Sequence, residues 1–259
     1  MNRAYFNGLK VVGQQAVFDS DYQAILDYAT AQGFTLPSAS QQQAGITLIT
    51  KLKNIGVWEK LKCFYVPATD GDEDFACINW KNTNEFNITR INSPLFTTND
   101  GFTAQPTTRL NTGFNPFTYN NWAAAEQATF GFFGDVVTNG TYTIGNTQGF
   151  GQPSFGTRFF HSPVEARFGL GENTTSVTGQ GAGNNTFRQV QRNGTQSIYY
   201  NDTAKQVTTQ SGNYFNGNVD LMPGGLTDEK YLVGWIADFL TETESLDFRL
   251  SILSYLNAL

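Results

Sequence analysis

The chain has 259 residues, of which only 15% are charged, and its formal net charge at pH 7 is −6. This acidic balance argues against a surface that binds nucleic-acid backbones or anionic membranes by charge, so we expect neither partner. The 26 glycines and 22 phenylalanines are typical of a mainly β protein rich in turns. A chain of this length buries roughly 70–75% of the surface that its unfolded form exposes, so its core needs no disulfide.

The two cysteines, Cys63 and Cys77, lie in apolar surroundings. They could be cross-strand neighbours joined by a disulfide, but we expect buried free thiols. No apolar run follows Met1, so we expect no signal peptide and synthesis in a reducing cytoplasm.

The first 60 residues predict an N-terminal arm and a helical anchoring segment. Residues 1–18 carry scattered apolar side chains without a clear period. Asp19-Ser20 is a candidate helix N-cap and Gly33 a terminator, and a second helix is expected from about Ser38 or Ser40, closed by Gly56. Two short amphipathic helices must pack on the rest of the chain or on another subunit.

Residues 61–259 predict a single β-sandwich. Turn and strand patterns alternate about every ten residues between 61 and 241, the spacing of a sandwich. Asn139-Gly140 and Asn193-Gly194 each predict a tight hairpin. We also expect a strand over residues 76–80.

The end of the chain predicts one buried strand followed by one helix. Residues 231–240 alternate and are rich in β-forming side chains, while Thr241 and Glu244 form a candidate capping box. This end resembles the last strand of laminin-G-like, concanavalin A-like sandwiches. The positions that match are Gly234, Ile236, Leu240, Thr241 and Glu244. The resemblance implies a jelly-roll sandwich with a closing C-terminal helix.

The closing helix carries two apolar stripes. We expect Leu246, Leu250 and Leu253 to face the core, so that Leu250→Ala costs roughly 2–5 kcal/mol. A second stripe is expected to pack on the N-terminal helices or on a neighbour; its members are Phe248, Ile252, Tyr255 and Leu259.

A second resemblance runs along the sandwich. The series is similar to structural virion proteins of tailed phages, especially crAss-like and related phages of Bacteroidetes; it comprises residues 56–66, 78–82, 96–102, 110–116 and 198–201. The resemblance implies a decoration, head-fibre or tail-fibre protein located in the virion. It further implies a homo-oligomer that contacts other virion proteins through its N-terminal segment.

Catalytic patterns are weak, and we predict that the chain is not an enzyme. Laminarinase-like glycosidases of the same fold carry Glu-x-Asp-x-x-Glu on one strand, which this sequence lacks. Glu242 and Glu244 resemble part of it but fit helix capping better. His161 has no nearby pattern of a catalytic triad, so we expect a packing role.

Two ligand sites are weighed against ordinary structure. Asp70, Asp72 and Asp74 alternate in one loop and could bind Ca²⁺, although a solvated turn is the simpler interpretation. Aromatic residues beside predicted loops could stack on sugar rings or pack in the core; they are Tyr119, Trp122, Tyr199, Tyr200 and Tyr214. The Gly/Asn/Thr-rich segments 145–157 and 171–186 are candidate adhesive loops.

Three functions remain in competition. The first is a phage virion structural protein that displays a lectin-like sandwich, with host surface glycans as possible ligands. The second is a glycan-binding lectin module on a cell surface. The third is a glycoside hydrolase of the same fold.

Overall fold

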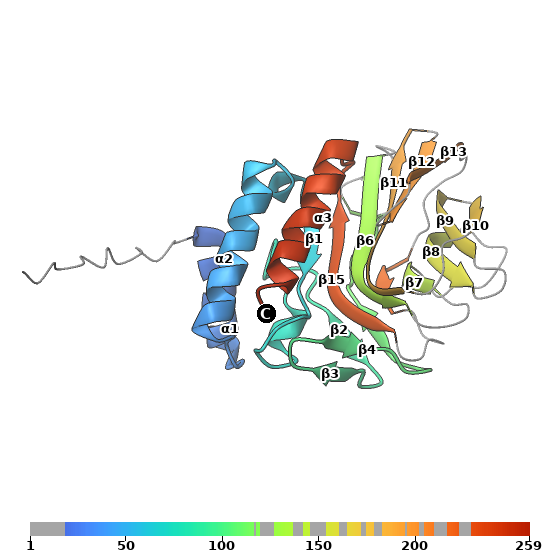
Figure 1. Ribbon diagram of the computed structural model, residues 1–259. Helices are drawn as coiled ribbons and strands as arrows, with labels where there is room; N and C mark the ends of the chain where they lie inside the picture. Colours follow the sequence, from blue (N-terminus) through green and yellow to red (C-terminus); the bar gives the residue numbers. More distant parts are fainter. Residues whose placement is uncertain are drawn as a thin grey trace, which may run out of the picture.

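The computed structural model describes residues 19–116, 118–119, 127–136, 142–145, 154–160, 165–171, 175–178, 183–194, 196–201, 205–209, 217–222 and 229–259. Three layers follow one another: a layer of three helices, a large β-sheet, and a second β-sheet (Figure 1). The mainly β sandwich predicted from the sequence is confirmed.

Sheet A is the central layer, and every pairing described in it is antiparallel. Its strands, in spatial order, are β13 (Lys205–Thr209), β12 (Gln196–Asn201), β11 (Gly183–Asn193), β6 (Gln127–Val136), β15 (Lys230–Ala237), β4 (Gly101–Thr103) and β3 (Leu95–Thr97), with β1 (Leu61–Tyr65) also paired to β15.

Sheet B faces one side of sheet A and is also antiparallel where it is described. Its strands, in spatial order, are β10 (Thr175–Thr178), β9 (Glu165–Gly171), β8 (Ser154–Phe160), β7 (Tyr142–Gly145), β14 (Asp220–Leu221), β5 (Arg109–Asn111) and β2 (Thr89–Ile91).

The two predicted hairpins have opposite outcomes. β11 and β12 pair around Gly194, whose φ of 58° is the left-handed conformation that glycine adopts easily. The hairpin at Asn139-Gly140 is wrong, because β6 belongs to sheet A and β7 to sheet B. The turn residues themselves lie outside the described part. The predicted strand over residues 76–80 is also wrong, since Phe75–Cys77 form a 3₁₀ turn.

The N-terminal helices begin and end where their caps predict. α1 (Ser20–Gln32) is capped by the Asp19 carboxylate, which accepts from the Asp21 and Tyr22 amides, and it ends at Gly33 with φ 78°. α2 (Ala39–Asn54) is capped by Ser38, and a short 3₁₀ turn over Trp58–Lys60 leads into β1. Among the described helices, none is long and apolar enough to span a membrane.

Two apolar cores lie on either side of sheet A. The inner core, between the sheets, contains Phe130 and Tyr231 of sheet A with Leu221 of sheet B. The outer core lies between sheet A and the helices. Here a Cβ atom on Gly131 of β6 would lie 2.2 Å from the Trp235 ring, so the absence of a side chain at Gly131 leaves the space that this ring occupies.

The outer core joins the helical segment to the sandwich. Ile25 of α1 and Leu48 of α2 are buried in the same cluster as Trp235 of β15 and Phe248 of α3 (Glu242–Leu256). The predicted division at residue 60 therefore does not separate two packing units. A chain that lacks residues 1–56 would lose the side chains that α1 and α2 contribute to this core, so we do not expect it to form an intact sandwich.

The closing helix has its predicted cap but faces the opposite way. The Thr241 and Glu244 capping box is present. Leu246 and Leu250 are 53% and 50% exposed, so their predicted burial is wrong. The core-facing residues are Phe248, Ile252 and Tyr255. Aromatic and β-branched side chains fill the wide space above sheet A, whereas Leu246 and Leu250 face away from it. Leu253 is half-buried against the outer core, and Leu259 of the second predicted stripe is 38% exposed.

Candidate functional site

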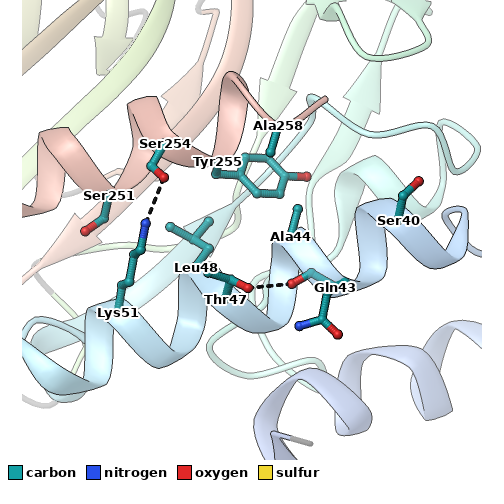
Figure 2. A pocket seen from close by; sticks show the side chains of 10 residues that line it. All are labelled: Ser40, Gln43, Ala44, Thr47, Leu48, Lys51, Ser251, Ser254, Tyr255 and Ala258. Carbon is teal, nitrogen blue, oxygen red and sulfur yellow. Dashed lines mark hydrogen bonds between the residues drawn. The ribbon is translucent and has the colours of Figure 1, made fainter. Parts of the chain in front are cut away.

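A groove lies between α2 and α3, with a volume of about 280 Å³ (Figure 2). Its size is near the lower end of the roughly 300–1,000 Å³ range of small-ligand sites. We call it the α2/α3 groove; it is lined by Ser40, Gln43, Ala44, Thr47, Leu48, Lys51, Ser251, Ser254, Tyr255 and Ala258.

The spacing of residues on α2 builds one wall of the groove. Ser40, Ala44, Thr47 and Lys51 recur every three or four residues and therefore share one helix face. Small side chains along this face leave space between the two helices. The buried Leu48 and Tyr255 contribute apolar surface below it, and the Tyr255 hydroxyl donates to the Ala68 carbonyl at 3.0 Å.

Lys51 reaches across from α2, and its Nζ donates to the Ser254 hydroxyl of α3 at 2.7 Å (Figure 2). Its surroundings differ from those of the other lysines in the described ranges, each of which lies within 4.0 Å of a carboxylate. Those pairs are Lys53–Asp19, Lys60–Glu244, Lys62–Asp238, Lys81–Glu59, Lys205–Glu242 and Lys230–Asp100. Lys51 is thus a cation without a counter-ion in the described structure.

A second, more open hollow adjoins the groove on the other side of Lys51. It is bordered by Asn54, Asp247 and the half-exposed Leu250. Asp247 forms no ion pair with Lys51. The Lys51 ammonium group therefore lies between the α2/α3 groove and this second hollow. Asp247 is the single acidic side chain that lines the hollow.

The acidic loop holds the N-terminal helices to the sandwich. The Asp70 carboxylate accepts from the Ser38 amide at 2.9 Å, and the Asp72 carboxylate accepts from the Thr35 amide at 2.6 Å. Asp74 instead pairs with Arg90. The three acids have different partners, and no group of three or more metal-ligating side chains occurs among the described residues. Calcium at this loop stays a prediction.

Replacement of Asp72 by Ala should lower the free energy of unfolding by roughly 1–3 kcal/mol, because the Thr35 and Phe75 amides lose a charged acceptor. Urea unfolding with and without a chelator measures the effect. We expect the same loss in both conditions. Destabilisation of the wild type by the chelator, together with insensitivity of the variant, would instead show a bound cation.

The predicted sugar-stacking residues are not brought together. Tyr199 is completely buried and accepts from Arg188 at 2.8 Å, so its predicted stacking role is wrong. Tyr200 is also buried, under Lys205. Tyr119 is half-buried against Phe86 and Phe114, with ring centroids 5.6 and 4.9 Å away.

Other sequence-based candidates lie outside the described residues. These are Trp122, Tyr214, His161 and the leader 1–18. The segments 145–157 and 171–186, predicted as adhesive loops, are described only in part. Where they are described, they contribute to strands β8, β10 and β11, so their assignment as loops throughout is wrong. The groove is not predicted by the sequence, because the buried apolar stripe of α2 indicates only which face packs on the core. The run of Ser, Gln, Thr and Lys beside that stripe is the pattern that marks it.

A second unpredicted feature is the buried carboxyl of Glu229. Its side chain is fully buried, and neither carboxylate oxygen has a hydrogen-bond partner in the described structure. Burial alone raises the pKa of Glu229 to about 9. Tyr231, two residues later on β15, is also buried, and burial and the charge of Glu229 raise its pKa as well. Glu229 is therefore protonated at neutral pH.

The chain is similar in fold to solved sialidase structures. It superimposes on Trypanosoma rangeli sialidase in complex with sialic acid with a TM-score of 0.53 and 8% identity, covering 81% of this chain and 39% of that chain. A mutant of that sialidase displaying trans-sialidase activity gives a TM-score of 0.56 and 9% identity, covering 83% and 39% of the two chains. Neither protein-family models nor curated proteins match the chain.

These likenesses establish the fold, and the chain spans only 39% of the length of either structure. They also contradict the prediction that the chain is not an enzyme, because both of these structures are those of enzymes. That prediction relied on a missing pair of carboxylates. Sialidases are exceptions to the paired-carboxylate rule because they use a tyrosine nucleophile, so the missing motif excludes only one reaction geometry.

Proposed function

We propose that the chain is a glycan-binding β-sandwich domain and that the α2/α3 groove holds the sugar. The observation that carries the proposal is the make-up of the groove: hydroxyl, amide and ammonium groups beside an apolar floor. The shared fold with a sialidase solved with sialic acid supports it.

The groove offers the two kinds of contact that a sugar ring uses. Thr47 and Gln43 are exposed on one wall and Ser254 on the other, so hydroxyl and amide groups face the space from both helices. The half-buried Ala44, above the buried Leu48 and Tyr255, supplies apolar surface for the C–H face of a sugar. The volume suits one sugar residue, so a single site is expected to bind weakly and to gain strength when many copies are displayed together.

A glycan array probed with the multimerised chain tests the proposal. We expect the wild type to bind a subset of glycans and Ala44→Trp, which fills the groove, to lose that binding. Ala31→Trp is the matched control, because Ala31 is exposed on α1 and does not line the groove. Circular dichroism verifies that both variants fold. Binding that survives in Ala44→Trp would place the sugar elsewhere, and silence of the wild type would refute the function.

We also propose, on the sequence resemblance alone, that the domain is displayed on a phage particle as a decoration, head-fibre or tail-fibre protein. Its N-terminal segment would contact other virion proteins, and several copies would present the groove to host surface glycans. Purified particles should contain the chain at a fixed ratio to the major capsid protein. A ratio that varies between preparations, or falls to zero on further purification, would contradict this proposal.

A further inference from the structure

On the basis of the glycan-binding function proposed above, we infer that the α2/α3 groove selects acidic sugars, with Lys51 binding the sugar carboxylate. The chemical class is a uronic or sialic acid. The selection follows from the charges at the groove and not from the identity of any similar protein.

The absence of a carboxylate beside Lys51 is the first support. The chain carries 22 acidic against 16 basic residues, and the other described lysines lie against acids. Lys51 donates instead to a neutral hydroxyl, that of Ser254. A lysine with no carboxylate within 4.0 Å in the described structure is available for an external anion.

The hydrogen-bonding capacity of Lys51 is the second support. An ammonium group has three donors, and one of them is used by Ser254. The others can reach a carboxylate that lies over the α2/α3 groove. Hydrogen bonds between charged groups are shorter and stronger than those between neutral groups, so the acid is the contact that discriminates between sugars.

The order of residues on α2 places neutral groups next to the cation. Thr47 lies one helical turn before Lys51 and Gln43 one turn before Thr47, with about 6 Å of helix between successive positions. A sugar whose carboxylate contacts Lys51 would therefore place its ring hydroxyls beside Thr47. The Thr47 hydroxyl donates to the Gln43 carbonyl at 2.8 Å, so its oxygen is oriented to accept from the ligand.

Asp247 opposes an anion at this position. It lines the hollow on the other side of Lys51 and forms no ion pair with it. Its negative charge should weaken the binding of an acid without affecting a neutral sugar. This opposing charge provides a second, independent variant, because its removal acts in the opposite direction to the removal of Lys51.

Titration calorimetry with glucuronic acid, its methyl ester and glucose, attached to a common multivalent carrier, tests the inference. We expect the wild type to bind glucuronic acid about tenfold more tightly than the two neutral ligands. Lys51→Met should abolish that preference, so that the variant binds glucuronic acid no more tightly than the two neutral ligands. Asp247→Asn should strengthen acid binding about two- to threefold and leave neutral binding unchanged.

Lys62→Met is the matched control, because Lys62 lies on β1 away from the groove and is paired with Asp238. Equal binding of acidic and neutral ligands by the wild type would overturn the acid selectivity while leaving the glycan-binding function standing. An unchanged preference in Lys51→Met would also overturn it. Binding of none of the ligands on the carrier or on the array would refute both. Displacement by acetate or inorganic phosphate as effectively as by glucuronic acid would show a simple anion site.

Discussion

Phe248→Ala is expected to lower the free energy of unfolding by about 3–5 kcal/mol. Phe248 is completely buried between α3 and sheet A. Its ring centroid lies 5.0 Å from that of Trp235 and 6.0 Å from that of Phe64. Truncation removes these contacts and leaves a cavity that neighbouring rings are too rigid to fill.

Leu250→Ala is the matched comparison on the same helix. Leu250 is 50% exposed, so we expect its replacement to cost less than about 1 kcal/mol. Urea unfolding of both variants and the wild type measures the two losses. Equal losses, or a larger loss for Leu250→Ala, would show that the helix is rotated by about half a turn from the arrangement described here.

Glu229→Gln is expected to stabilise the protein by about 3 kcal/mol at pH 7. The native pKa of Glu229 is about 9, against an ordinary value of 4.5. Between these values the folded chain holds a proton that the unfolded chain releases, so stability falls as the pH rises from about 4.5 to about 9. A glutamine has no proton to lose and avoids this penalty.

The gain should therefore depend on pH. We expect it to vanish below pH 4, where glutamate is protonated in both states, and to reach its full value near pH 9. Urea unfolding at pH 4, 7 and 9 measures it, with Glu59→Gln as a control because the Glu59 side chain is 80% exposed. A gain of equal size at all three pH values would contradict a protonated native carboxyl.

Local sequence was sufficient for the helix ends. Asp19, Ser38 and Thr241 are all caps, because one side-chain oxygen close to free backbone amides determines where a helix begins. The hairpin predicted at Asn139-Gly140 shows the limit of such local rules. The same dipeptide, Asn193-Gly194, connects the paired strands β11 and β12, whereas β6 and β7 belong to different sheets. The sheet that each strand joins is determined by its pairing with strands elsewhere in the sequence, such as β15 for β6 and β14 for β7.

The orientation of α3 shows the same limit. Its sequence carries two apolar stripes, and either one could form a core face. Phe248, Ile252 and Tyr255 are the side chains that fill the space between sheet A and α2. No pattern within the helix shows which of the two stripes fills that space. The groove was unpredictable for a related reason: Lys51 and Ser254 are brought together only by the packing of α2 on α3.

The pairing of β1 with β15 has a consequence for synthesis. Leu61 pairs with Ala237 and Tyr65 with Gly234. The early strand β1 therefore cannot form this pairing until β15, the last described strand, has left the ribosome. Until then the apolar faces of α1 and α2 have no partner on α3 or β15. Such distant pairings make folding slow and leave the nascent chain open to aggregation. We expect chaperones to occupy these faces during translation, and a chain stopped before β15 to be insoluble.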